Sequence, residues 1–179
     1  LKAPTLEGFK RVRDLLQEQE ANIHPEHLKE YYTYLRNLRS MLMDLNGPDE
    51  IRPVLFQIII DNLARGYFYQ EGKITAYAMM NIVYIALGEK DIAWANAFVE
   101  RHKNLIVDEN ETQDFYRIGK ALCLFAEKKY EAALGHIPFD LPNAVVHLVS
   151  RRLELKIYYE QDSDLLPYKL DAFKMFIRR

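Results

Sequence analysis

The sequence predicts an all-α protein, and three observations support this prediction. Apolar residues recur with the periodicity of a helix along most of the chain, and strict alternation over the length of a strand is absent. Glycine and proline are scarce, with seven of each among 179 residues, whereas a sandwich or barrel of many strands needs a turn about every ten residues. We expect every proline to fall between helices or near a first turn, so that none interrupts a helix interior.

The second expected helix shows the periodicity most clearly. It should end at Asn46, since Gly47 suits a left-handed cap and Pro48 cannot continue the helix. Asp49 can then cap the helix that follows. Six side chains separated by steps of three and four residues form one stripe of this second helix: Leu28, Tyr31, Leu35, Leu38, Leu42 and Leu45.

Turn residues set the remaining boundaries. Gly72 and Gly88 are typical of turns between neighbouring helices, and residues 108–112 read as a polar loop. Ser163 or Asp164 can cap the last helix. Links of two to six residues imply antiparallel neighbours. The sequence therefore predicts about nine helices, at residues 5–21, 25–45, 49–70, 73–87, 90–105, 111–126, 129–136, 143–160 and 163–178.

Composition and charge narrow the classes of function. The net charge is −2, and even the most basic part, residues 151–179, carries only seven Lys and Arg against five Asp and Glu, so nucleic acid is not an expected partner. No apolar run is long enough to span a membrane, and we expect no membrane partner and a cytoplasmic location. The chain begins at Leu1 rather than at Met, and we take it to be a fragment of a longer protein that forms one helical repeat domain over residues 1–179.

Motifs for catalysis and for metal binding are missing from the sequence. His24 and His27 stand three residues apart, but no cysteine or third histidine nearby completes a ligand set, so we predict no metal site. Cys123 lies in an apolar run, which favours a buried, inert thiol over a nucleophile. No nucleophile elbow, phosphate-binding glycine loop or zinc-protease motif is present, and we expect neither enzymatic activity nor a cofactor.

Three segments of the chain repeat one pattern, an apolar helix followed by a polar turn and a second helix. The turns at Gly88, Lys128 and Asp162 are 40 and then 34 residues apart. The middle copy carries small, large, aromatic and small side chains in a fixed order: Ala121, Phe125, Tyr130 and Ala133. Small residues let two helices of a hairpin approach closely, and large ones fill the groove between hairpins.

With these residues the middle copy resembles a tetratricopeptide repeat, and residues 73–179 as a whole resemble a degenerate array of such repeats. Leu155 departs from the pattern, because it stands where a small residue is expected. Residues 125–134, 155–160 and 173–179 are also similar to uncharacterised repeat proteins of Bacteroidetes-type bacteria. The resemblance implies a right-handed superhelix of antiparallel helix pairs.

The resemblance also implies a function, since the first helix of each pair lines the concave face of such arrays. On that face we expect a scaffold surface that binds a protein or an acidic peptide. The sequence leaves open whether its apolar middle, at Ile118, Leu122 and Phe125, is an exposed groove or is buried against a neighbouring helix. The candidate partner-binding residues are Asn81, Tyr84, Arg117, Arg152, Lys156 and Tyr159.

Two alternative functions stay open at this point. A regulatory or nucleic-acid-binding helical array would use the basic residues near the end of the chain, namely Arg151, Arg152, Lys156, Arg178 and Arg179. A structural spacer within a longer repeat protein would instead stack its terminal helices on further repeats. The spacer would therefore expose an apolar end and self-associate through its terminal helices.

Overall fold

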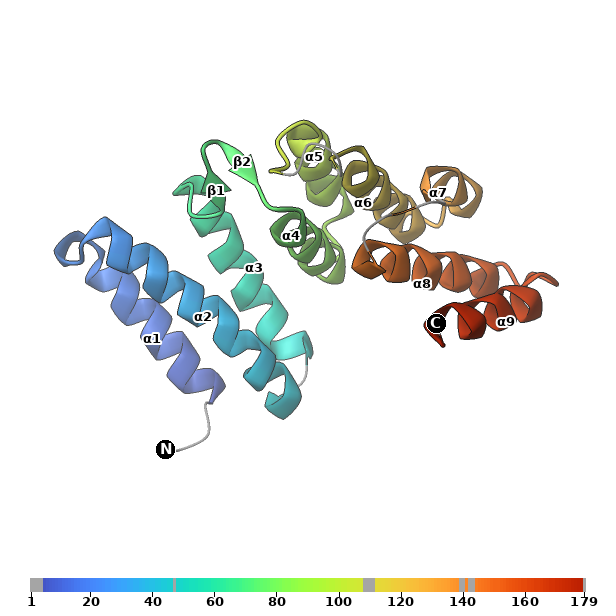
Figure 1. Ribbon diagram of the computed structural model, residues 1–179. Helices are drawn as coiled ribbons and strands as arrows, with labels where there is room; N and C mark the ends of the chain where they lie inside the picture. The colour runs from blue at the N-terminus through green and yellow to red at the C-terminus, as the bar shows by residue number, and fades with distance from the viewer. Residues whose placement is uncertain (1–4, 47, 108–111, 139–140, 142–143, 179) are drawn as a thin grey trace. The chain divides into compact units, whose positions relative to one another are not determined.

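A computed structural model describes residues 5–46, 48–107, 112–138, 141 and 144–178 (Figure 1). The described part of the chain confirms the all-α class, with nine α-helices, one 3₁₀ turn and two strands of two residues each. The elements are α1 (Leu6–Glu18), η1 (Glu20–Asn22), α2 (Pro25–Asn46), α3 (Pro48–Ala64), β1 (Tyr69–Gln70), β2 (Lys73–Ile74), α4 (Ala76–Gly88), α5 (Ile92–His102), α6 (Thr112–Ala126), α7 (Tyr130–His136), α8 (Ala144–Glu160) and α9 (Leu166–Ile177).

Both predicted bounds of the third helix are wrong. The helix expected over 49–70 ends at Ala64, because Gly66 has a φ of 76° and takes the chain out of the helix. The helix begins at Pro48, so Asp49 lies inside it, and the cap expected at Gly47 is outside the described residues. Pro53 also lies inside this helix, which continues past the proline with one backbone hydrogen bond fewer.

The fourth helix starts three residues later than expected, at Ala76. Thr75 caps it, since the Thr75 hydroxyl accepts a hydrogen bond from the backbone N–H of Ala78 at 3.3 Å. Ile74, just before this cap, is extended and bridges Ile106: its N–H donates to the carbonyl of Leu105 at 2.7 Å. This short bridge holds the segment after α5 against the start of α4.

The chain divides into two compact units, Leu1–Glu71 and Gly72–Arg179. The second unit nearly coincides with residues 73–179, where the repeat pattern is clearest. In the first unit α2 packs against both α1 and α3. The stripe predicted on α2 is shifted by one residue at one position, because Tyr32 is 1% exposed and Tyr31 is 43% exposed. Buried residues of α1, α2 and α3 form the core of the first unit: Phe9, Leu28, Tyr32, Leu35, Leu42, Ile51 and Ile58.

In the second unit the helices pack as three successive pairs, α4 with α5, α6 with α7, and α8 with α9. The first helices of neighbouring pairs also contact each other, α4 with α6 and α6 with α8. Gly119 shows how close this packing is, since a Cβ added there would lie 3.1 Å from a methyl carbon of Val99 on α5.

The three pairs share one turn geometry. Lys90, Lys128 and Asp162 each have a positive φ, of 62°, 61° and 49°. In each turn this residue donates its N–H to the carbonyl three residues back, and the next residue donates to the carbonyl five residues before itself, which is the Schellman arrangement. The first turn is therefore centred on Lys90 rather than on the predicted Gly88.

This common turn aligns the pairs residue by residue. Ala95 in α5 and Ala133 in α7 then occupy equivalent positions, and both side chains are fully buried. The third pair differs at its second helix: α5 and α7 begin after Asp91 and Lys129, which directly follow the turn residue, whereas α9 begins after Leu165, three residues beyond Asp162. The hydroxyl of Ser163 instead accepts a hydrogen bond from the N–H of Leu165 at 3.3 Å, so neither Ser163 nor Asp164 is the residue directly before the helix.

Candidate functional site

Five of the six predicted partner-binding residues line three adjoining hollows in the second unit. The first, of about 120 Å³, includes Asn81 and Tyr84 in its lining; the second, of about 230 Å³, includes Tyr84, Arg152 and Lys156. The third, of about 440 Å³, includes Lys156 and Tyr159. Because Tyr84 lines both the first and second hollows and Lys156 both the second and third, we treat them as one surface, the α4–α8 groove.

One wall of the α4–α8 groove comes from α4. Tyr77, Asn81 and Tyr84 follow each other at steps of four and three, which places them on one helix face, and all three are exposed. The opposite side of α4 carries Met79 and Val83, which are fully buried. Burial of the apolar side against the neighbouring helices therefore orients the polar and aromatic side outward.

The facing wall comes from α8, on which Arg152, Lys156 and Tyr159 also stand at steps of four and three. All three side chains are exposed, and that of Tyr159 is 71% exposed. Among the described residues neither Arg152 nor Lys156 forms a hydrogen bond or an ion pair. The groove thus presents two cations whose charges no nearby carboxylate of the described chain neutralises by direct contact.

The floor of the α4–α8 groove comes from α6. The sequence left open whether the apolar residues of this helix are exposed or buried. Ile118 is 1% exposed and Leu122 is 6% exposed, so the apolar middle is buried at these two positions. Phe125 is only partly buried and lines the third hollow. These side chains form the bottom of the groove rather than an open apolar strip.

Arg117 is the predicted residue that the structure does not bring to the groove. It lies on α6, is half-buried, and lines none of the three hollows. The positive charge of the groove therefore comes from α8. Glu160 lines the third hollow near Lys156 and makes that end less positive than the middle.

Tyr84 lines both the first and the second hollow, beside residues of α8. Burial raises the pKa of the Tyr84 phenol, and the positive charge of Arg152 offsets this in part. Since the pKa rises from a value that is already near 10, Tyr84 carries a neutral hydroxyl at neutral pH. This hydroxyl can donate a hydrogen bond to an acceptor on a ligand.

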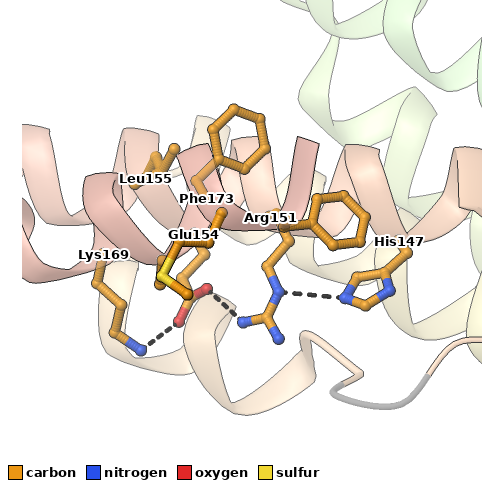
Figure 2. A pocket seen from close by; sticks show the side chains of 9 residues that line it. His147, Arg151, Glu154, Leu155, Lys169 and Phe173 are labelled. Carbon is orange, nitrogen blue, oxygen red and sulfur yellow. Dashed lines mark hydrogen bonds and ion pairs between the residues drawn. The ribbon is translucent and has the colours of Figure 1, made fainter. Parts of the chain in front are cut away.

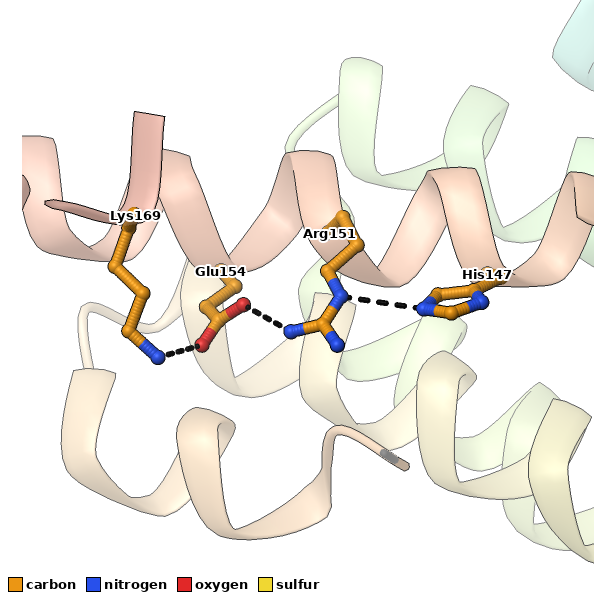
Figure 3. A network of polar contacts seen from close by, with 4 residues as sticks. All are labelled: His147, Arg151, Glu154 and Lys169. Atoms are coloured by element: carbon orange, nitrogen blue, oxygen red, sulfur yellow. Dashed lines mark hydrogen bonds and ion pairs between the residues drawn. The ribbon is translucent and has the colours of Figure 1, made fainter. Parts of the chain in front are cut away.

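A second group of polar side chains, which was not predicted from the sequence as a cluster, lies between α8 and α9. Arg151 donates from Nε to Nε2 of His147 at 3.2 Å and from Nη1 to Glu154 at 3.0 Å (Figure 3). Lys169 of α9 donates to the other carboxylate oxygen of Glu154 at 2.7 Å. That hydrogen bond raises the pKa of Lys169.

Part of this cluster has a sequence signal. His147, Arg151 and Glu154 stand at steps of four and three, a spacing that predicts contacts along one face of a helix. Lys169 comes from another helix, and no local pattern predicts its contact with Glu154. Arg151, which the nucleic-acid alternative counted among its basic residues, is paired here.

The remaining candidates have ordinary environments. Cys123 is fully buried, as predicted, and burial raises the pKa of its thiol to about 11. His24 and His27 contact each other edge to face, with ring centroids 5.9 Å apart. Among the described residues no group of three His, Cys, Asp or Glu side chains is placed to hold a metal ion. Nor does the described part contain a helix long and apolar enough to cross a membrane.

Comparisons of the chain with protein-family models, with curated proteins and with solved structures found no match.

Proposed function

We propose that the protein is an interaction scaffold, built from tetratricopeptide-like helix pairs, whose α4–α8 groove binds a peptide segment carrying an acidic side chain. The observation that carries this proposal is the state of Arg152 and Lys156. Both are exposed beside a groove with aromatic walls, and neither pairs with another residue in the described part of the chain.

The contrast within α8 supports a role for these two cations. Arg151, one residue away from Arg152, is engaged by Glu154 and His147, and Lys169 is engaged by Glu154 as well. An acidic side chain of a partner would be the first direct counter-charge for Arg152 and Lys156. Charge-assisted hydrogen bonds of this kind are stronger than neutral ones.

The walls and floor of the groove suit the apolar part of such a peptide. Tyr77, Tyr84 and Tyr159 are exposed large aromatic side chains, and tyrosine is a frequent anchor residue at interfaces because it offers apolar area with a polar end. Phe125 adds a partly buried ring at the third hollow. A peptide that alternates acidic and apolar side chains can satisfy both sets of groups.

The packing of the second unit supports the tetratricopeptide-like part of the proposal. Three pairs share one turn geometry, and their first helices contact each other in succession, as in arrays of helix pairs. In such an array the face formed by α4, α6 and α8 would be the concave one. That is the face that holds the α4–α8 groove.

A peptide selection followed by affinity measurements tests the proposed function. From a displayed library of random 12-residue peptides, we expect enrichment of sequences that combine Asp or Glu with apolar residues. Fluorescence anisotropy then gives the affinity of a selected peptide for the wild type and for the double variant Arg152→Gln and Lys156→Gln. We expect the variant to bind at least about tenfold more weakly, a change that corresponds to the loss of one charge-assisted hydrogen bond.

A matched control variant separates the groove from general positive charge. Arg101→Gln with Lys103→Gln removes two exposed cations of the same unit that line none of the three hollows. This control should bind within about twofold of the wild type, a change of less than 0.5 kcal/mol. Equal losses in both double variants, or selected peptides without acidic residues, would contradict the proposal.

A second candidate function, a structural spacer in a longer repeat array, is favoured by the surface of α9. Tyr168, Met175 and Ile177 on this helix are all more than half exposed, and α9 contains no buried residue. An apolar face of this kind is what a terminal helix that stacks on another helix pair would show. The nucleic-acid alternative is less well supported, because Arg151 is paired with Glu154.

A further inference from the structure

A pocket of about 380 Å³ lies between α8 and α9, and we call it the α8–α9 pocket (Figure 2). One side is polar, with His147, Arg151, Glu154 and Lys169, and the other is apolar, with side chains of α9. Its volume lies within the roughly 300–1,000 Å³ that is usual for small-molecule sites. It shares only Leu155 with the residues that line the α4–α8 groove.

The polar side carries an excess of positive charge. Arg151 and Lys169 both bind Glu154, whose side chain is almost buried, so two cations share one carboxylate. His147 adds no negative charge. Because the Nε–H of Arg151 can only donate, Nε2 of His147 is the acceptor of the hydrogen bond between them.

Arg151 retains donors that the cluster does not use. A guanidinium has five N–H groups, and Arg151 directs its Nε to His147 and its Nη1 to Glu154. Its Nη2 forms no hydrogen bond with any described residue, and Figure 3 shows the remaining terminal nitrogen directed away from the carboxylate of Glu154. A guanidinium with free donors and a net positive surrounding is suited to a carboxylate oxygen.

The apolar side is formed mainly by two phenylalanines and a methionine of α9. The rings of Phe173 and Phe176 have centroids 6.3 Å apart, and the Phe176 ring lies 4.5 Å from the ring of His147. Met175 is 63% exposed, so its thioether is available to a ligand. An aromatic or branched apolar group placed here would cover these side chains while its anionic end reaches Arg151.

We propose that the α8–α9 pocket binds a small carboxylic acid with an aromatic or branched apolar body. The carboxylate is held by Arg151 and the excess positive charge that it forms with Lys169. The body lies against Phe173, Met175 and Phe176. This site is independent of the proposed function, since neither Arg152 nor Lys156 lines the pocket.

Nuclear magnetic resonance on the whole chain tests the site without any variant. With 3-phenylpropanoate as the probe, we expect saturable shifts of the Met175 methyl and of the Phe173 and Phe176 rings. The methyl of Met79, which is fully buried in α4, should not shift and serves as the internal control. The absence of saturable shifts at Met175 up to millimolar probe overturns the proposal.

Three further probes separate the chemical contributions. The neutral 3-phenylpropanamide and the bodiless acetate should each bind at least tenfold more weakly than 3-phenylpropanoate. If either probe binds as tightly as 3-phenylpropanoate, binding does not require both a charge and an apolar body, and the proposal is overturned. A short acetylated peptide that ends in phenylalanine with a free carboxylate carries the same chemistry, and tenfold tighter binding by this peptide overturns the assignment to a small acid.

Variants then assign the anion contact. Arg151→Gln removes the guanidinium but leaves Glu154 paired with Lys169, and we expect at least tenfold weaker binding of 3-phenylpropanoate. Arg152→Gln removes the neighbouring cation, which lies in the α4–α8 groove, and should leave the affinity unchanged. If the two variants lose affinity equally, Arg151 is not the anchor; circular dichroism of each variant confirms that α8 and α9 remain folded.

Discussion

Arg65, which directly follows α3, contacts both η1 and α2 through one guanidinium. Its Nε and Nη2 donate to the two carboxylate oxygens of Glu20 at 2.8 and 2.7 Å, and its charge lies 5.5 Å from the centre of the Tyr32 ring. The hydrogen bonds from Arg65 lower the pKa of Glu20. A two-point contact of this kind holds its geometry better than a single exposed ion pair.

This ion pair predicts a pH-dependent contribution to stability. Because the pKa of Glu20 is lower in the folded state than in the unfolded chain, the contribution is present above about pH 4.5 and is lost as the pH falls through the folded-state pKa. Urea unfolding of Glu20→Gln should show a loss of about 0.5–1 kcal/mol at pH 7, discounted for a side chain that is one third exposed. The difference from wild type should shrink below pH 4, and a difference that grows there would contradict the assignment.

Single residues also show where the sequence prediction was wrong. The stripe on α2 was predicted with Tyr31, but the side chain in the core is that of Tyr32, whose ring contacts Tyr67. Both tyrosines have the same apolar character, and helical spacing allows either step of three or of four at this position. Only the position of the neighbouring helix decides which ring is buried.

At the scale of the element, three helices of the second unit end in the same way. Lys90, Lys128 and Asp162 adopt the left-handed conformation at the end of α4, α6 and α8, although none of them is glycine. A non-glycine residue in this conformation costs about 1–2 kcal/mol. The Schellman hydrogen bonds and the packing of the following helix offset this cost.

The turn after α6 yields a prediction on stability. Lys128→Gly should raise the free energy of unfolding by about 0.5–1 kcal/mol, because relief of the left-handed strain exceeds the entropy that glycine adds to the unfolded chain. Lys129→Gly is the contrasting variant: Lys129 has a φ of −88°, so glycine relieves no strain there, and the exposed ion pair with Glu127 is lost as well, so stability should fall. Urea unfolding of both variants measures the difference, and a lower stability for Lys128→Gly would show that the turn is not strained.

At the scale of the whole molecule, the chain separates into two compact units with different organisation. The first has one core shared by α1, α2 and α3. The second spreads its buried residues between successive helix pairs, each of which contacts its neighbours. In the described part of the second unit, α9 contains no buried residue and exposes apolar side chains.

The α9 surface predicts concentration-dependent self-association. Tyr168, Met175 and Ile177 expose apolar area that a second copy can cover. Sedimentation equilibrium should show an average mass that rises with protein concentration, and Met175→Lys with Ile177→Lys should suppress the rise. Leu105→Lys with Val107→Lys changes two other exposed apolar residues and should not suppress it; a monomer at every concentration would contradict the prediction.

The sequence by itself determined the all-α class, the number of helices and most of their bounds, because periodicity and turn residues are local properties of the chain. It also predicted that Asn81 and Tyr84 share one helix face and that Arg152, Lys156 and Tyr159 share another, since steps of three and four residues define a face of a helix. Such patterns define the faces of a single helix, but they do not predict which other helix packs against each face.

Only the tertiary structure decided what lies across from each face. It joined the residues of α4 to those of α8 over a buried floor of Ile118 and Leu122, and it left Arg117 outside the groove. It also paired Glu154 with Lys169 of another helix, while Arg152 stayed unpaired among the described residues. The physical reason is that burial and ion pairing depend on which helices pack together, and periodicity within one helix does not specify its neighbour.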